Sequence, residues 1–266
     1  MSDAVLTVYG VPASQPSRAV YWTCLIKGLA FELRTPELLG DGESGLGALN
    51  PKRQIPTIVQ GDFVLYEMPA ILAWLCNANG WDDFYPLEPS ARALIDQYLH
   101  FHHTTTRLAT IKLMASHVTI AFGGVPEGGK DILLGEGIRT AMSGPDVYER
   151  GRAVVQMVAE LIEAGYLRDR GGYLCSRERP TIADIACYEE LSQLRWASLF
   201  DFAGFPKLQS WLDRMAKLPF HENAHRYNVV LGDILSRPNT MERFIAAGTA
   251  GVAALEEIGI PINRDG

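Results

Sequence analysis

The sequence predicts an α/β domain followed by an all-helical domain, and three observations support this prediction. Short runs of apolar and β-branched residues, typical of strands, occur in about the first 80 residues. Beyond Pro89 the apolar residues recur at spacings of three, four or seven, which is typical of helices. An acidic, proline-containing segment at 82–89 separates the two regions. We therefore place the first domain at residues 1–85 and the second at residues 90–266.

The first domain has the predicted order strand, helix, strand, loop, strand, strand, helix. Residues 4–9 and 31–34 are the first two strands, and residues 17–27 are a helix that Gly28 ends. A glycine-rich loop follows, with one helical turn at 46–49. Two β-branched runs on either side of residues 60–62 predict a hairpin, and Glu67 opens the next helix.

The second domain is predicted to contain amphipathic helices. The first extends from Ser90 to His117, the second covers 147–162, and the third lies between Pro206 and Pro219. Residues 122–145 are rich in glycine, and we interpret them as an irregular connection that could cover a ligand. The tail after residue 226 is expected to add one or two helices.

The composition is that of a soluble globular protein, with 47% hydrophobic residues among 266. A net charge of −7 provides no basic field for a phosphate backbone, so we expect no nucleic-acid partner. The sequence shows no signal segment and no stretch of the ~20 apolar residues that span a bilayer, so we expect a cytoplasmic chain without a membrane partner. The cysteines lack metal or CxxC spacing and are expected to be buried free thiols, with no metal site: Cys24, Cys76, Cys175 and Cys187.

A polar tetrad, Ser14-Gln15-Pro16-Ser17, lies where the first strand meets the first helix. Thioredoxin-like proteins carry CxxC at this junction, because the helix N-terminus stabilises a thiolate. Hydroxyls cannot cycle through a disulfide, so thiol oxidation by the protein's own residues is excluded. A serine hydroxyl can instead donate to the thiolate of a ligand, whose pKa of about 8.5 would need to fall by roughly 2 units to ionise at neutral pH. The simpler interpretation is that Ser14 or Ser17 is only a helix N-cap.

Two further features indicate what the ligand is. Ile55-Pro56 is an X-Pro step that could be cis and could expose the Ile55 backbone to a peptide-like ligand. Glu67-Met68 begins a helix whose free amides could bind a carboxylate, while the Glu67 side chain could bind an ammonium group. Glutathione combines a thiol, a peptide bond, a carboxylate and an amine.

Six stretches, in the same order and at similar spacing, resemble cytosolic glutathione S-transferases, most of all the serine-type theta class. They are SQPSRAVYW at 14–22, NPKRQIPTI at 50–58, GDFVLYE at 61–67, ARALIDQYLHFHHTTTR at 91–107, PTIADIACYEEL at 180–191 and FPKLQSWLDRMAKLP at 205–219. The resemblance implies a thioredoxin-like first domain, an all-α second domain, and glutathione as co-substrate with small hydrophobic electrophiles. It also implies a homodimer, for which we expect the interface near Phe63 and Tyr66.

The resemblance implies roles for individual residues. Ser14 would stabilise the thiolate, and an electrophile would be conjugated in a detoxification type of reaction, with peroxidase or dehalogenase side activity. Glutathione would be bound by Gln54, Ile55, Pro56, Glu67, Met68, Arg107, Arg53 and Glu43. The electrophile would contact Pro12, Ala13, Phe101, Thr105 and Leu108. Thr181 and Asp184 match a helix-capping motif and are expected to serve folding.

Departures from the family pattern give weight to an alternative to this enzyme. Met68 replaces a serine, which removes one charge-assisted hydrogen bond of roughly 1.5–3 kcal/mol, and Gln54 replaces a lysine. The alternative is a non-catalytic binding or assembly module with a decayed glutathione site. Arg107 could equally be a solvated helix residue. His102 and His103 point about 100° apart on a helix, so we expect packing or surface roles for them.

Overall fold

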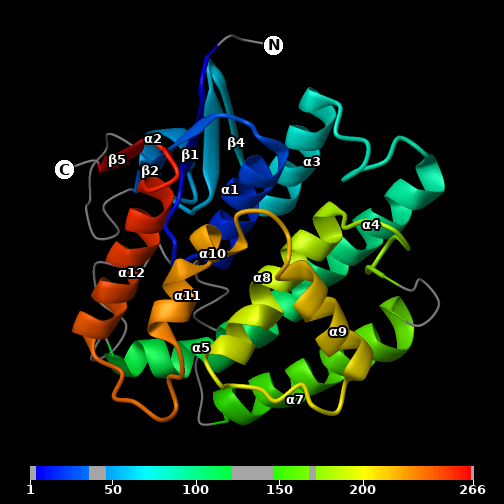
Figure 1. Cartoon of the computed structure of the whole chain (residues 1–266), viewed down its shortest axis with the longest axis vertical. Helices are drawn as coiled ribbons and strands as arrows, with labels where there is room; N and C mark the ends of the chain where they lie inside the picture. Colours follow the sequence, from blue (N-terminus) through cyan, green and yellow to red (C-terminus); the bar gives the residue numbers. More distant parts are fainter. Residues whose placement is uncertain (1–3, 36–45, 122–145, 168–171, 265–266) are drawn as a thin grey trace.

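A computed structural model of the chain describes residues 4–35, 46–121, 146–167 and 172–264. In these residues five strands form one sheet, in the order β4-β3-β1-β2-β5 (Figure 1). β1 (Leu6–Tyr9) is parallel to β2 (Phe31–Thr35) and antiparallel to β3 (Thr57–Gln60), which pairs with β4 (Phe63–Tyr66). Val8 lies opposite both Leu33 and Ile58, and none of the three is exposed, so the centre of the sheet belongs to the core.

Three helices complete the first domain. They are α1 (Gln15–Lys27), α2 (Leu46–Leu49) and α3 (Met68–Asn79). α1 begins two residues before the position expected from the sequence, because Ser14 caps it and Pro16 suits the first turn. It ends at Gly28, whose φ of 65° is left-handed and favours glycine. α1 packs against α3 and against the helical region, so it links the two parts of the molecule.

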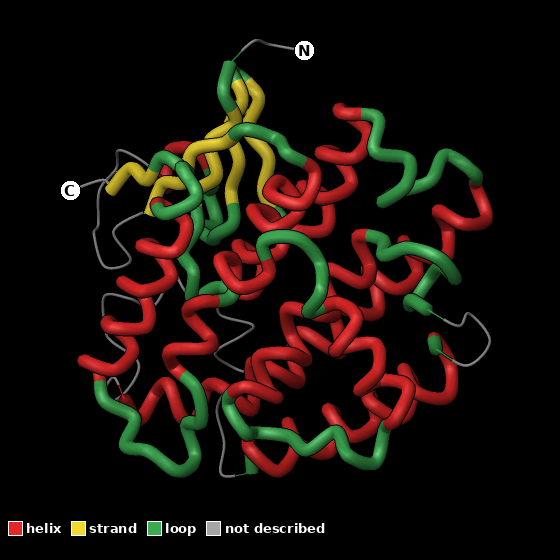
Figure 2. Tube along the Cα trace, viewed as in Figure 1, coloured by secondary structure: helices red, strands yellow, loops and turns green. Residues whose placement is uncertain are grey.

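The second region is helical, and Figure 2 shows the strands gathered at one end of the molecule with helices filling the rest. Its helices are α4 (Pro89–Phe101), α5 (Arg107–Ala121), α7 (Val147–Leu161), α8 (Ile182–Trp196), α9 (Pro206–Met215), α10 (His221–Ala224), α11 (Arg226–Leu231) and α12 (Met241–Glu256). Two π-helical turns, η1 (His102–Thr106) and η2 (Ile162–Tyr166), follow α4 and α7. Within the described residues, no helix is long and apolar enough to cross a membrane.

α8 is the central helix of this region. Every residue from Ile182 to Leu194 is buried, including Glu189 and Glu190, whose charges therefore need partners inside the protein. At its start the Asp184 carboxylate accepts from the amide of Thr181 at 2.9 Å and from the indole Nε1 of Trp211 at 2.9 Å. Burial raises the pKa of Asp184, and these hydrogen bonds act in the opposite direction. The capping motif expected at Thr181 and Asp184 is present and holds α8 to α9.

The single helix expected from Ser90 to His117 is interrupted at η1. The hydroxyl of Thr104 donates to the carbonyl of His100 at 3.3 Å, so a side chain competes for the backbone acceptors that a regular helix would use. A π-helical turn adds only about one residue per turn. Apolar spacings of three, four or seven tolerate such an insertion, and the sequence pattern therefore does not reveal it.

The end of the chain returns to the first domain. β5 (Ile262–Arg264) lies parallel to β2, and the amide of Leu33 donates to the carbonyl of Pro261 at 2.9 Å. This corrects the expectation that residues 90–266 are helical throughout. A three-residue strand is too short for a period-two pattern, and it forms because β2 would otherwise leave its outer backbone groups unpaired.

Candidate active site

The register of the sheet brings three of the predicted segments to one edge. Tyr9, the last residue of β1, lies opposite Thr57, and Thr57 lies opposite Tyr66. The turn that follows Tyr9, the Ile55-Pro56 step that precedes Thr57 and the Glu67-Met68 step that follows Tyr66 therefore meet at the same end of the sheet. Ser14, Ile55, Pro56, Glu67 and Met68 belong to these segments.

The serine turn, which we define as Val11–Ser14, connects β1 to α1. The amide of Ser14 donates to the carbonyl of Val11 at 3.0 Å, which closes the turn. The Ser14 hydroxyl oxygen accepts from the amide of Ser17 at 3.3 Å, so Ser14 is the N-cap of α1. A hydroxyl has two lone pairs and one proton, and the cap uses only a lone pair. Ser14 is partly exposed, so its proton remains available to a ligand at the positive end of α1.

Arg18 secures the serine turn, and the sequence analysis missed it. Its side chain is fully buried, and Nη1 donates to the carbonyl of Pro12 at 2.8 Å. Its Nε lies 2.7 Å from Glu189 Oε2, and Nη2 donates to Gln193 Oε1 at 2.6 Å. A charged residue on a helix normally indicates a solvated face, and the sequence alone carries no signal for the distant glutamate.

Ile55-Pro56 is a cis peptide bond. Among the described residues, neither the amide nor the carbonyl of Ile55 has a hydrogen-bond partner, so both could serve an extended ligand. The loop before it is organised by Asn50, which is fully buried and which the sequence analysis did not select. Its side chain donates to the carbonyl of Gln54 at 3.0 Å and to the hydroxyl of Thr57 at 3.1 Å.

The start of α3 offers fewer amides than the sequence analysis assumed. Pro69 follows Met68 and has no N–H, so Met68 and Ala70 provide the free amides of the first turn. Glu67 has a left-handed φ of 71°, and its carboxylate lies 2.8 Å from Lys52 Nζ. This contact raises the pKa of Lys52. Both side chains are largely exposed, so an ammonium group on a ligand could replace Lys52 at low cost.

The sequence analysis also assigned Arg53 and Glu43 to glutathione binding. Arg53 is partly buried with a φ of 51°, and its guanidinium approaches Gly47 on α2. Glu43 lies outside the described residues.

Arg107 is partly exposed at the start of α5, with 21% of its side chain accessible. Its Nη1 lies 2.8 Å from Glu190 Oε1 on α8, and Thr110 donates to the same carboxylate. Burial raises the pKa of Glu190, and Arg107 acts against that rise. The partner of Arg107 in the structure is thus α8, and a solvated surface role for this arginine is excluded.

The predicted electrophile residues fall into two groups. Pro12 is buried against Gly251 of α12, and Ala13 beside it is exposed. Phe101 packs on the rings of Tyr98 and Tyr166, with centroids 6.1 and 6.2 Å away. Thr105 and Leu108 are partly buried on η1 and α5.

His102 has the packing role expected from the sequence. It is buried, and neither ring nitrogen has a hydrogen-bond partner among the described residues. Burial, reinforced by the nearby charge of Arg107, lowers its pKa to about 3. A neutral, enclosed imidazole of this kind is unsuited to acid–base work near pH 7.

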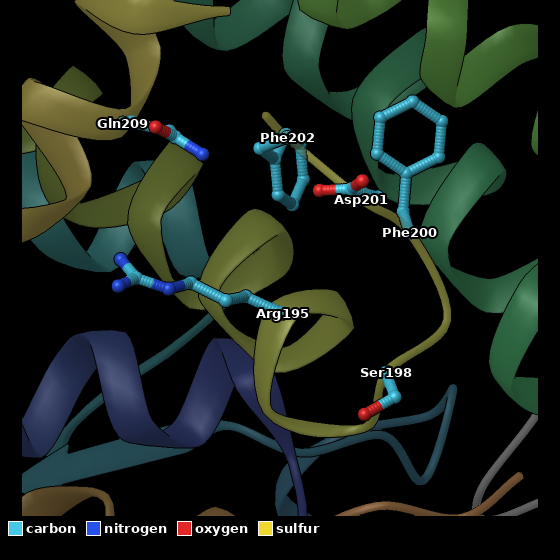
Figure 3. Close-up of a pocket in the computed structure, with 6 residues that line it drawn as sticks. All are labelled: Arg195, Ser198, Phe200, Asp201, Phe202 and Gln209. Atoms are coloured by element: carbon cyan, nitrogen blue, oxygen red, sulfur yellow. The ribbon is translucent and has the colours of Figure 1, made fainter. Parts of the chain in front are cut away.

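One shallow cavity of about 280 Å³ lies elsewhere, between the end of α8 and α9 (Figure 3). It is lined by Arg195, Ser198, Phe200, Asp201, Phe202 and Gln209. It shares no residue with the edge that carries Ser14, so the sheet register is the better guide to the site. In the described residues, no cluster of three or more His, Cys, Asp or Glu side chains could hold a metal ion.

A thioredoxin-like sheet with a serine at the first strand-to-helix turn, joined to a helical domain, defines a class of thiol-binding transferases. Residues 8–82 match the family model described as "Glutathione S-transferase, N-terminal domain". Human glutathione S-transferase theta-2 is 32% identical over 205 residues, covering 76% of this chain and 77% of the relative. Theta-2 from Rattus norvegicus is 30% identical over 209 residues, covering 76% and 77%.

Solved structures give the same result. Human glutathione S-transferase T1-1 in its apo form superposes with a TM-score of 0.71 at 25% identity, covering 94% of this chain and 99% of that one. Human glutathione transferase theta-2, solved in complex with glutathione and an unknown ligand, gives 0.69 at 25% identity, covering 93% and 98%. The chain belongs to the glutathione S-transferase family, and these relatives are of its theta class.

Proposed function

We propose that this enzyme conjugates glutathione to small hydrophobic electrophiles, with the Ser14 hydroxyl as the donor that stabilises the thiolate. The observation that carries the proposal is the hydrogen bond that Ser14 Oγ accepts from the Ser17 amide, while no described residue accepts the Ser14 hydroxyl proton. The cap fixes the oxygen at the N-terminus of α1, where the helix dipole also favours an anion. In this proposal the same hydrogen bond caps the helix and orients the donor.

The chemistry needs little from the protein beyond this donor. Glutathione loses its thiol proton to solvent, and the thiolate sulfur forms a bond to the electrophilic carbon. The leaving group departs with the bonding electron pair, or an opened ring oxygen takes up a proton from water. Lowering the thiol pKa by roughly 2 units supplies the nucleophile at neutral pH.

Backbone groups would bind most of the tripeptide. We assign the cysteinyl backbone of glutathione to Ile55, whose amide and carbonyl are unpaired among the described residues, with Gln54 and Pro56 beside it. The γ-glutamyl carboxylate would take the amide of Met68, and its ammonium group would replace Lys52 at Glu67. We also assign glutathione contacts to Arg53 and Arg107, and to Glu43, which lies outside the described residues.

The electrophile would lie over the serine turn, against an apolar wall. We assign this wall to Pro12 and Ala13 on one side and to Phe101, Thr105 and Leu108 on the other. A mostly apolar surface beside one thiolate accepts many electrophiles, so substrate range would follow shape more than hydrogen bonding.

We also propose a cytoplasmic homodimer. The four cysteines are all buried and free, as fits a reducing compartment. Phe63 on the edge strand β4 is 41% exposed and stacks on Trp74 of α3 with centroids 4.8 Å apart, an aromatic pair suited to an interface. Sedimentation of the wild-type chain measures the oligomeric state.

The test is a glutathione titration of the wild type and of Ser14→Ala, read by thiolate absorbance as pH is varied. We expect Ser14→Ala to bind glutathione but to return the bound thiol pKa toward about 8.5. Its kcat is expected to fall by about 10²–10³. Ser17→Ala is the matched control, because its hydroxyl is buried without a partner among the described residues. A wild type that shows no saturable binding at millimolar glutathione would contradict the proposal and favour a non-catalytic module.

A further inference from the structure

Glu189 lies at the centre of a buried cluster of charged and polar groups, in a part of α8 distant in sequence from the serine turn. One carboxylate oxygen lies 2.7 Å from Arg18 Nε on α1, and the other lies 2.9 Å from His225 Nε2 at the start of α11. The opposite ring nitrogen of His225 donates to the carbonyl of His221 at 2.8 Å, which fixes the orientation of the ring. Burial would raise the pKa of Glu189, but His225 and Arg18 together hold it below its usual value, so the carboxylate is ionised.

Arg18 holds the serine turn at two points. Its side chain donates to the carbonyl of Pro12 at 2.8 Å, and its backbone amide donates to the carbonyl of Ser14 at 2.9 Å. The backbone bond belongs to α1 and any residue at position 18 would make it, so the Arg18 side chain acts on the serine turn through Pro12, two residues before Ser14. An arginine donates in a rigid planar fork, so an anchor at Nε also sets the position of Nη1.

Glu189 is that anchor. Its side chain is 1% exposed and sits on a helix that is buried on all sides, so it has little freedom to move. Gln193, one turn further along α8, accepts from Nη2 of the same arginine at 2.6 Å. All three guanidinium nitrogens of Arg18 thus donate hydrogen bonds, two of them to α8 and one to the serine turn.

We propose that Glu189 is a positioning residue for the transferase reaction: by fixing Arg18, it aims the Ser14 hydroxyl at the glutathione sulfur. The inference rests on the proposed role of Ser14. Glu189 touches neither glutathione nor the electrophile in this scheme and acts only through Arg18 and the turn.

If Glu189 acted only through its charge, its removal would change the pKa of the bound thiol in the opposite direction. Removing its charge would leave the Arg18 cation uncompensated near the site, and a nearby cation lowers the pKa of a thiol. Misdirecting the Ser14 donor would instead raise that pKa. The direction of the change in the bound thiol pKa separates the two roles.

The experiment measures the pKa of the glutathione thiol bound to Glu189→Ala, Glu189→Gln and Arg18→Lys, together with kcat and KM for glutathione. We expect the bound thiol pKa to rise by about 1 unit in Glu189→Ala, with kcat reduced about tenfold and KM within about twofold of the wild type. Glu189→Gln, which still offers an oxygen to Arg18, is expected to recover part of the loss. Arg18→Lys keeps the charge without the fork and is expected to behave like Glu189→Ala.

Glu190 provides the matched control. It is the next residue, is also 1% exposed and is also paired with an arginine, but its partner is Arg107 and not the serine turn. Glu190→Gln leaves the Arg107 cation uncompensated, which can only lower the bound thiol pKa, so this variant is expected not to raise that pKa even where it costs stability.

The outcomes separate this inference from the proposed function. A wild type that ionises glutathione while all Glu189 and Arg18 variants ionise it equally overturns the inference alone. A lowered thiol pKa in Glu189→Gln also overturns it, in favour of the electrostatic role. A wild type that leaves the thiol pKa of glutathione unchanged overturns both.

Discussion

At the scale of single residues, the two interpretations of Ser14 are compatible. Its oxygen accepts a hydrogen bond from the Ser17 amide at 3.3 Å and caps α1, while no residue in the described part of the chain accepts its proton. Replacing the serine therefore removes a cap worth about 1 kcal/mol as well as a donor. Loss of stability in Ser14→Ala is thus uninformative about catalysis, whereas the pKa of the bound thiol reports the donor directly.

His102 makes stability depend on pH. Burial keeps it neutral in the folded protein down to a pKa of about 3, whereas in the unfolded chain it titrates near 6.5. Between these values the unfolded chain binds more protons, so stability is retained above pH 6.5 and lost as pH falls. We expect His102→Leu to reduce this slope by up to about 1.4 kcal/mol per pH unit, measured by urea unfolding at pH 7, 6 and 5.

The neighbouring histidine is the control for this prediction. His103 is exposed on the same π-helical turn, so His103→Leu makes the same substitution without removing a buried ring, and its slope is the reference for that of His102→Leu. Equal slopes in the wild type and in His102→Leu would contradict the prediction, because they would mean that the buried ring accepts a proton as readily as the unfolded chain.

Local sequence patterns predicted only part of the candidate site. Ser14, Ile55-Pro56 and Glu67-Met68 are each marked by a junction, an X-Pro step or a helix start, and the sheet register brings them together. No local sequence pattern of this kind identifies Asn50 or Arg18. They act through partners that folding supplies, and for Arg18 the partner is 171 residues away.

At the scale of elements, α12 packs directly on the serine turn. A Cβ atom at Gly251 would lie 2.6 Å from Cβ of Pro12 and 3.3 Å from that of Tyr227, so only glycine permits this approach. We expect Gly251→Ala to push α12 away from Pro12, to destabilise the fold by about 1–3 kcal/mol and to lower kcat/KM, because the turn carries Ser14. Thermal unfolding and steady-state kinetics measure the two effects.

Gly248, one turn earlier on α12, supplies the control. A Cβ atom there would have no neighbour within 4 Å, so Gly248→Ala is expected to stabilise the helix by about 0.5–1 kcal/mol. If Gly251→Ala also stabilised the protein and left kcat/KM intact, the close approach of α12 to the turn would not matter for activity.

Most elements were predictable because each carries its own signal. Gly28 ends α1, the turn at Gln60–Asp62 separates β3 from β4, and the capping motif opens α8. The π-helical turn η1 and the strand β5 were not predictable. The turn η1 shifts the helical periodicity of the sequence by too little to detect. The strand β5 forms by pairing with the edge of β2, and its own three residues are too few to carry a strand pattern.

At the scale of the whole molecule, both ends of the described chain meet in one sheet. β5 pairs with β2, and α12, which precedes it, lies beside this edge of the sheet (Figure 1) and contacts Pro12 of the serine turn through Gly251. The buried cluster around Glu189 joins α1, α8 and α11 beneath the same turn. The helical region therefore determines the geometry of a site whose predicted ligand contacts lie largely on the first domain.

The last prediction concerns the dimer. We expect the wild type to sediment at twice the chain mass of 29.3 kDa, and Phe63→Glu to sediment as a single chain, because a carboxylate on the exposed β4–α3 aromatic pair cannot be buried without a partner. Leu161→Glu is the matched control, since Leu161 on α7 has the same exposure of 41%. If Leu161→Glu dissociated the dimer and Phe63→Glu did not, the interface would lie on the α7 face.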